Sequence, residues 1–176
     1  MLILREFKKL LPFTHEGTGL TLKLIDLKHR KIYVDNMLTD EYCKYNGIDF
    51  KSIGKQKLLQ GYTNLVGIYS IQKYAESIRM LVMLGDKCIG GAAIYSKQSG
   101  EITLGYFVLK NYMGFGYGTK VLCTLKDYVN RLIEKGVINS KVLLEIDKNN
   151  IKSIRVAEAN GFSLIQNNND ILKYKM

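Results

Sequence analysis

The stretch GYFVLKNYMGFGYGTK (105–120) joins the end of an apolar run to the start of an amphipathic segment. Three glycines, Gly114, Gly116 and Gly118, alternate with larger residues where the helix is expected to begin. Glycine adopts backbone angles closed to other residues, so successive N–H groups can converge on one point at the positive end of the helix dipole. The stretch therefore predicts a phosphate or pyrophosphate site, with a simple tight turn as the alternative.

The glycine spacing excludes two other phosphate-binding loops. A Walker loop needs G-x-x-x-x-G-K-[ST], whereas Gly118 is followed by Thr119 and then Lys120. A Rossmann loop needs a third glycine where Thr119 stands, and it follows the first strand of a βαβ unit. The strands expected before this loop form an antiparallel meander instead.

The hydrophobic pattern around the glycine loop predicts an α+β fold. Residues 78–109 contain three apolar runs separated by Gly-Asp and by Gln-Ser-Gly, which predicts a three-stranded meander. Residues 117–135 show helical spacing and end at Gly136, which suits a helix C-cap. The other predicted elements are strands at 19–26, 141–146 and 170–176, helices at 28–38 and 150–162, and a polar segment at 39–70 that is mostly loop with one or two short helices.

Composition favours one globular domain and weakens a nucleic-acid function. The chain has 176 residues, of which 47% are hydrophobic and 24% charged. The net charge of +10 is compatible with a polyanionic partner. However, lysine supplies most of this charge, and a lysine-rich solvated surface explains it without nucleic acid.

Cysteine usage and the N-terminal sequence indicate a cytoplasmic protein. Cys43, Cys88 and Cys123 are widely separated and form no C-x-x-C motif, so neither a disulfide framework nor a metal site is expected. Charges within residues 5–9 interrupt the first apolar run before a signal peptide could form. No later run reaches the roughly 18 apolar residues of a spanning helix, so no membrane partner is expected.

The runs 105–119 and NIKSIRVAEANGF (150–162) resemble the GNAT superfamily of acyl-CoA-dependent N-acetyltransferases, most of all its RimJ/RimL-like branch. The resemblance extends over residues 19–176 and implies a mixed β-sheet flanked by helices, with parallel, splayed fourth and fifth strands. It implies acetyl-CoA as co-substrate and no metal. Residues 1–18 are left as an N-terminal extension of unknown role.

The resemblance also assigns the cofactor-binding residues. In the family, a Q/R-x-x-G-x-G/A loop binds the CoA pyrophosphate through backbone amides, and here Met113 replaces the usual Gln or Arg. The end of the fourth strand offers backbone groups to the pantetheine arm, which can add to it like a peptide strand. The implied cofactor-binding residues are Phe107, Val108, Met113, Gly114, Phe115, Gly116, Tyr117, Gly118, Thr119, Asn150 and Ser153.

The catalytic residues implied by the resemblance are Ser153 and Glu101. Many superfamily members place a tyrosine where this chain has Ala157, whereas the RimL-like branch uses an N-x-x-S pattern to put a serine near the thiol. Ser153 is therefore the expected proton donor, although Asn150 and Ser153 also suit a simple helix cap.

A general base is harder to assign. The branch often has glutamate where this chain has Thr103, and Glu101 lies two residues earlier on the same strand face. Glu101 is the predicted base, and a solvated turn glutamate is the alternative.

The predicted function is direct transfer of an acetyl group from acetyl-CoA to a primary amine, with a protein N-terminus as the preferred acceptor. The alternatives are a small amine, such as a polyamine or an amino-bearing antibiotic, and a non-catalytic acyl-CoA-binding module. The sequence indicates neither the acyl-chain preference nor the oligomeric state.

Overall fold

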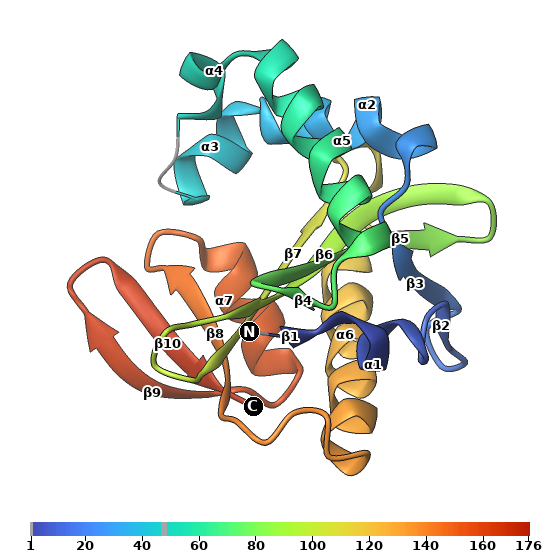
Figure 1. Ribbon diagram of the computed structural model, residues 1–176. Coiled ribbons are helices and arrows are strands. Elements are labelled where there is room, and N and C mark those ends of the chain that lie inside the picture. Colours follow the sequence, from blue (N-terminus) through green and yellow to red (C-terminus); the bar gives the residue numbers. More distant parts are fainter. Residues whose placement is uncertain (1, 47–48) are drawn as a thin grey trace. The chain divides into compact units, whose positions relative to one another are not determined.

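The computed structural model describes residues 2–46 and 49–176 (Figure 1). The chain forms two compact units. One comprises Met1–Leu24 and Lys73–Met176, and is called the sheet unit below. The other comprises Ile25–Gln72 and is called the helical unit.

The sheet unit is built on an eight-stranded sheet with the strand order β2-β3-β5-β6-β7-β8-β10-β9. Its strands are β2 (Phe13–His15), β3 (Leu20–Leu24), β5 (Ser77–Leu84), β6 (Lys87–Ser96), β7 (Ile102–Val108), β8 (Val142–Asp147), β9 (Ser163–Asn168) and β10 (Ile171–Lys175). All neighbouring strands are antiparallel except β7 and β8, which are parallel. This arrangement confirms the predicted α+β class and the predicted parallel pair.

Two helices complete the core of the sheet unit. Helix α6 (Tyr117–Glu134) packs against β2, β3 and β7, and α7 (Ile151–Ala159) packs against α6 and β8. The inward positions of α6 are almost fully buried, because its apolar residues recur every three or four positions along one face. The meander and both helices confirm the predictions for these segments.

The first residues of the chain belong to this core as well. The short strand β1 (Leu2–Ile3) pairs with β4 (Tyr74–Ala75), and α1 (Leu4–Lys8) follows it. Phe7 is 1% exposed, and its carbonyl accepts a hydrogen bond from the buried Tyr128 hydroxyl at 2.9 Å. Strand β2 then extends the sheet beside β3. The segment for which the sequence suggested no role therefore packs against α6 and supplies a strand.

The helical unit corrects the prediction for residues 39–70. It contains a 3₁₀ turn η1 (Leu27–His29) and the helices α2 (Arg30–Met37), α3 (Asp40–Asn46), α4 (Phe50–Ile53) and α5 (Lys55–Ile71). The expectation of mostly loop was wrong, since α5 alone has 17 residues. Its periodicity is weak because Gly61, Gly67 and several polar residues interrupt it, but it buries Tyr62 against Tyr33 of α2, with ring centroids 5.2 Å apart.

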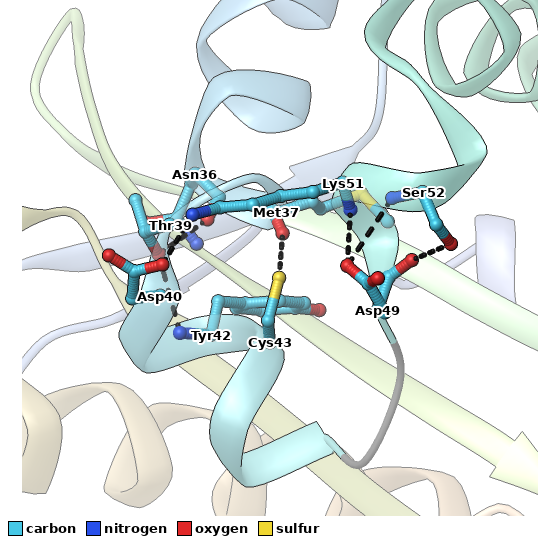
Figure 2. A network of polar contacts seen from close by, with 9 residues as sticks. All are labelled: Asn36, Met37, Thr39, Asp40, Tyr42, Cys43, Asp49, Lys51 and Ser52. Atoms are coloured by element: carbon cyan, nitrogen blue, oxygen red, sulfur yellow. Dashed lines mark hydrogen bonds and ion pairs between the residues drawn. The ribbon is translucent and has the colours of Figure 1, made fainter.

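Short polar side chains close the turns of the helical unit (Figure 2). The Thr39 hydroxyl donates to the Asn36 carbonyl at 2.8 Å, just before α3 begins. Asp49 caps α4 by accepting hydrogen bonds from the backbone N–H groups of Lys51 and Ser52 at 3.1 and 3.3 Å. The Lys51 ammonium also forms an ion pair with Asp40 and lowers the pKa of that carboxyl.

Strand β9 was not predicted. It pairs with β10 as an outer hairpin, and every one of its residues is exposed. Its side chains therefore carry no alternation between buried and exposed positions, which is the pattern that identifies a strand from sequence.

Candidate active site

Strands β7 and β8 separate halfway along their length. Their parallel pairing runs from Ile102 opposite Val142 to Leu104 opposite Leu144. Within the described residues it stops there, although β7 continues to Val108 and β8 to Asp147. The other edge of β7 stays paired with β6 throughout. Beyond Leu104, β7 thus presents one strand edge to which an amide-bearing chain can add.

The predicted phosphate loop follows directly from this edge. After the 3₁₀ turn η2 (Lys110–Tyr112), the backbone passes through Gly114 at φ +86° and Gly116 at φ +75° into α6. These angles suit glycine, because a Cβ is strained in the left-handed region. Gly116 is the N-cap of an 18-residue helix and provides no side-chain cap, so the first N–H groups of α6 stay available to an anion.

The side chains around the loop are mostly exposed. Met113 and Phe115 are 37% and 73% exposed, and Thr119 is exposed as well. Tyr117 is half-buried and packs edge-on against Tyr112, with ring centroids 6.1 Å apart. The side chain of Met113, the residue that replaces the usual Gln or Arg, is therefore partly exposed to solvent beside the loop.

Helix α7 lies close to the start of α6. A Cβ built on Gly118 would be 3.4 Å from Cγ2 of Val156, which is ordinary van der Waals contact. The Asn160 side chain also donates to the Thr119 carbonyl at 3.3 Å. Position 118 therefore lies at the contact between α6 and α7.

The beginning of α7 holds the predicted proton donor. Asn150 follows a tight turn from β8, in which its N–H donates to the Asp147 carbonyl at 2.8 Å. Its side-chain oxygen accepts a hydrogen bond from the Ser153 N–H at 3.2 Å, so Asn150 is the N-cap of α7. The backbone of Ser153 is thereby fixed, while its half-buried hydroxyl can still rotate.

Tyr106 is a site residue that the sequence reasoning missed. It lies on β7 just beyond the last residue paired with β8, and its hydroxyl oxygen is buried. Burial raises the pKa of Tyr106 to about 12, and the neighbouring Ser153 hydroxyl acts in the opposite direction. The phenol therefore stays protonated at neutral pH. In the sequence, the signal is a tyrosine at the strand position between two apolar residues, Leu104 and Val108, that share its face by alternation. The structure shows that both of these residues are buried.

Glu101 lies at the opposite end of β7 from the glycine loop. It precedes the strand in the β6–β7 turn, where its carboxylate accepts a hydrogen bond from the Ser99 hydroxyl at 3.1 Å. At about 3.3 Å per residue, the strand separates Glu101 from the loop by roughly 20 Å. The nearby Thr103 hydroxyl is buried without a hydrogen-bond partner among the described residues.

A second carboxylate lies nearer to the point of strand separation. Glu145 of β8 is one residue past the last β7–β8 pair. It is held by the ammonium groups of Lys97 at 2.8 Å and Lys173 at 3.8 Å. The sequence offered no reason to select it, because it is a single charge within an apolar strand.

The described part of the chain shows neither a metal cluster nor a membrane helix. Across residues 2–46 and 49–176, no group of three or more His, Cys, Asp or Glu side chains is arranged to hold a metal ion. Of the helices in these residues, none combines the length and the apolar character needed to span a bilayer.

Comparison with known proteins agrees with this architecture. The family model "Acetyltransferase (GNAT) domain" matches residues 20–163. No curated protein sequence matches significantly. Among solved structures, the chain is similar to the ribosomal L7/L12 α-N-protein acetyltransferase RimL in complex with coenzyme A, with a TM-score of 0.69, 15% identity, and coverage of 89% of this chain and 93% of that one.

Two further solved structures show the same fold. The aminoglycoside acetyltransferase AAC(6')-Ib in complex with coenzyme A has a TM-score of 0.66 and 16% identity, covering 89% of this chain and 92% of that one. An acetyltransferase from Agrobacterium tumefaciens str. C58 has a TM-score of 0.67 and 19% identity, covering 89% and 90%. At these identities the likeness establishes a shared fold, and the acceptor must be argued from the residues themselves.

Proposed function

The chain belongs to the acetyltransferase (GNAT) domain family, and we propose that it transfers an acetyl group from acetyl-CoA to the amine of a protein N-terminus. One observation carries this proposal. The free edge of β7 continues directly into a glycine loop with positive φ angles at the N-terminus of α6. The two features together suit a co-substrate that has an amide-bearing arm joined to a pyrophosphate.

The residues present fit such a co-substrate. The backbone N–H groups of 114–119 would hold the pyrophosphate, and the backbone of Phe107 and Val108 would bind the pantetheine amides. Because these contacts come from the backbone, the replacement of the usual Gln or Arg by Met113 leaves them intact. The exposed Lys110 and Lys120 add positive charge beside the loop.

Positioning supplies most of the proposed rate enhancement. When the amine nitrogen attacks the thioester carbon, a C–N bond forms, the C–S bond breaks, and the electron pair leaves with sulfur. Holding amine and thioester together is worth about 7–11 kcal/mol when the geometry is good. A backbone N–H at the free edge of β7 would stabilise the charge on the carbonyl oxygen.

Side chains then assist the proton movements. We propose that Ser153 donates a hydrogen bond to the leaving sulfur, as its place in the first turn of α7 allows. Glu101 is the proposed base and would act through water, given its place in the β6–β7 turn. Glu145 is a second candidate because it lies at the point where the strands separate. Acid–base help of this kind adds about 100- to 10,000-fold.

The choice of a peptide acceptor is supported by the likeness to RimL, whose name describes an α-N-protein acetyltransferase. A small amine remains the second candidate, because AAC(6')-Ib has a similar TM-score.

The redox state of the cysteines supports a cellular location. The described cysteines Cys43, Cys88 and Cys123 form no disulfide, and thiols stay reduced in a reducing compartment. We therefore propose that the protein acts in the cytoplasm, together with the intracellular pool of acetyl-CoA. Selective loss of activity in a reducing buffer would argue against this placement.

The first experiment measures thiol release from acetyl-CoA with a panel of N-terminal peptides, polyamines and aminoglycosides. Faster release with peptides supports the proposal, and faster release with small amines supports the second candidate. If CoA binds and no amine accelerates release, the chain is a binding module.

The second experiment tests the loop. Gly116→Glu places a carboxylate in the anion site and should abolish CoA binding. Gly85→Glu is the matched control, because Gly85 also has a positive φ of +56° but lies in the β5–β6 turn. Equal CoA affinity in both variants would overturn the loop assignment.

The third experiment separates the catalytic candidates. Ser153→Ala should lower kcat more than it lowers CoA affinity. Glu101→Gln and Glu145→Gln distinguish the two carboxylates, since the base is the one whose loss flattens the rise of kcat/KM with pH. If neither variant alters this rise, water alone takes the proton.

A further inference from the structure

We propose that Tyr95 of β6 binds the acceptor amine above the start of the free edge of β7, on the face of the sheet opposite α7. The Tyr95 hydroxyl oxygen accepts a hydrogen bond from one amine N–H and so turns the nitrogen lone pair towards the thioester. This inference rests on the proposed acetyl transfer and adds to it the place and the contacts of the second substrate.

Strand register decides which face of the sheet α7 covers. Tyr174 of β10 lies opposite Leu144, and its hydroxyl donates to the Glu158 carboxylate of α7 at 3.3 Å. Helix α7 therefore covers the face that bears Leu144. Leu104 is paired with Leu144 and shares that face. Gly105, the next residue of β7, is directed to the opposite face.

The reaction brings the amine to this opposite face. A co-substrate arm that adds to the edge of β7 lies in the plane of the sheet, and its thioester carbonyl lies close to the same plane. A nucleophile has to meet the carbonyl carbon from above or below that plane. Helix α7, which carries the proposed donor Ser153, lies on one side, so the amine arrives from the side of Gly105.

Gly105 allows the Tyr95 side chain to lean across β7. Tyr95 pairs with Thr103, so its ring stands on the same face as Gly105. A Cβ built on Gly105 would lie 3.1 Å from Cε2 of Tyr95 and 3.8 Å from its hydroxyl oxygen. The Arg79 guanidinium of β5 lies 5.9 Å from the ring centroid on the same face. Tyr95 and Gly105 are both partly exposed, so a ligand can reach the hydroxyl.

The order of groups in the co-substrate puts its thioester below this hydroxyl. In the proposed binding mode, the pyrophosphate lies at 114–119 and the pantetheine amides at Phe107 and Val108. The arm then runs back along β7, and the thioester follows the amides. At about 3.3 Å per residue, the thioester comes level with residues 105 and 106. This is one residue past Leu104, the last residue of β7 that is paired with β8.

A neutral primary amine has two N–H groups and one lone pair, and the site offers an acceptor for each N–H. Tyr95 stands on the β6 side of the free edge. Glu145 stands on the β8 side of the same face, because Leu143, two residues earlier, pairs with Thr103. With both N–H groups bound, the lone pair is left for the thioester carbon. As the C–N bond forms, the nitrogen becomes positive and one of its protons passes to the base, while the C–S electron pair leaves with sulfur. The Tyr95 oxygen and the Glu145 carboxylate stabilise this positive charge.

Tyr95→Phe tests the contact, because it keeps the ring and removes the oxygen. Two amines serve as probes: the fastest amine of the thiol-release panel, and the same molecule methylated on the reacting nitrogen. The variant should lower kcat/KM for the primary amine about threefold to tenfold, the effect of one lost hydrogen bond, with CoA affinity unchanged. The N-methyl amine gives its one N–H to the carboxylate and should lose less. The ratio of the two kcat/KM values should therefore fall.

Gly105→Ala is the second variant. Its Cβ would displace the Tyr95 ring by a few tenths of an ångström, and the hydroxyl would move with it. This change should lower the same ratio while CoA affinity stays unchanged. Tyr128→Phe is the matched control, because it removes another hydroxyl of the sheet unit, one that donates to the Phe7 carbonyl at 2.9 Å. It should leave the ratio as in the wild type.

The outcomes separate this inference from the proposed function. If no amine accelerates thiol release by the wild type, acetyl transfer fails as the function, and the amine site fails with it. If the wild type is active but Tyr95→Phe leaves kcat/KM unchanged, or lowers it equally for both amines, only the Tyr95 inference is overturned. If Tyr95→Phe does not fold, the ratio measured in Gly105→Ala decides, and an unchanged ratio overturns the inference.

Discussion

Gly90 determines how closely β6 and β7 can approach, and Gly90→Ala tests this spacing. A Cβ built on Gly90 would lie 2.2 Å from the Phe107 carbonyl oxygen and 3.3 Å from Cα of Val108. Real Cβ atoms essentially never approach another atom closer than 3.0 Å, so the two strands must move apart by at least 0.8 Å, the difference between these distances. The atom displaced belongs to the backbone of a residue proposed to bind pantetheine.

The expected losses concern both stability and CoA affinity. Overpacking of a closely packed site costs about 1–3 kcal/mol, and in a chain of this size each kcal/mol lowers Tm by about 2–4 °C. The movement also strains the neighbouring hydrogen bond from the Leu109 N–H to the Ile89 carbonyl, now 2.8 Å long. Thermal unfolding measures the first loss, and calorimetric titration with CoA measures the second.

Gly61→Ala is the matched control for this variant. A Cβ on Gly61 meets nothing within 4 Å, and the residue lies inside α5, so the change should stabilise the protein by about 0.5–1 kcal/mol. If Gly90→Ala unfolds at the wild-type temperature and binds CoA with wild-type affinity, the described spacing of β6 and β7 is incorrect.

Two hydrogen bonds and one buried hydroxyl give further predictions about stability. Tyr128→Phe removes one of two donors to the Phe7 carbonyl, which still accepts from the Leu10 N–H at 3.2 Å, and should lower the free energy of unfolding by about 0.5–1.5 kcal/mol in a urea titration; an unchanged midpoint would contradict the contact. Asn150→Ala removes the cap of α7 and should cost about 0.5–2 kcal/mol, whereas Asn150→Asp should retain most of the stability. The pKa of Tyr106 is about 12 in the folded protein against about 10 unfolded, so its contribution is complete below pH 10 and is lost as the pH rises to 12. Between pH 9 and 12 the free energy of unfolding should therefore fall by about 2–3 kcal/mol less in Tyr106→Phe than in the wild type. Identical pH profiles for the two proteins would refute the burial of the phenol.

The elements predicted correctly are those with a strong local pattern. The meander shows apolar runs with turn residues between them, and α6 shows helical spacing that ends near Gly136. The glycine loop is local too, because positive φ angles at Gly114 and Gly116 depend on residue type and on the turn itself. These features could be inferred without knowing any long-range contact.

The elements that were missed depend on distant partners. Helix α5 has interrupted periodicity, and its packing on α2 through Tyr62 stabilises it as a helix. Strand β9 is exposed along its whole length and exists through its pairing with β10. Strand β2 has three residues, too few for a periodic signal, and is held by β3.

The sequence by itself determined the family fold, the loop that suits a pyrophosphate, and the serine at the start of α7. The tertiary structure decided which side chains share the site with that serine. It places Tyr106 beside Ser153 and puts Glu101 in a turn at the far end of β7. The reason is that such proximity depends on the β7–β8 register and on the turn from Asp147 to Asn150, which are long-range or three-dimensional features. No local pattern encodes the distance between residues so far apart in the chain.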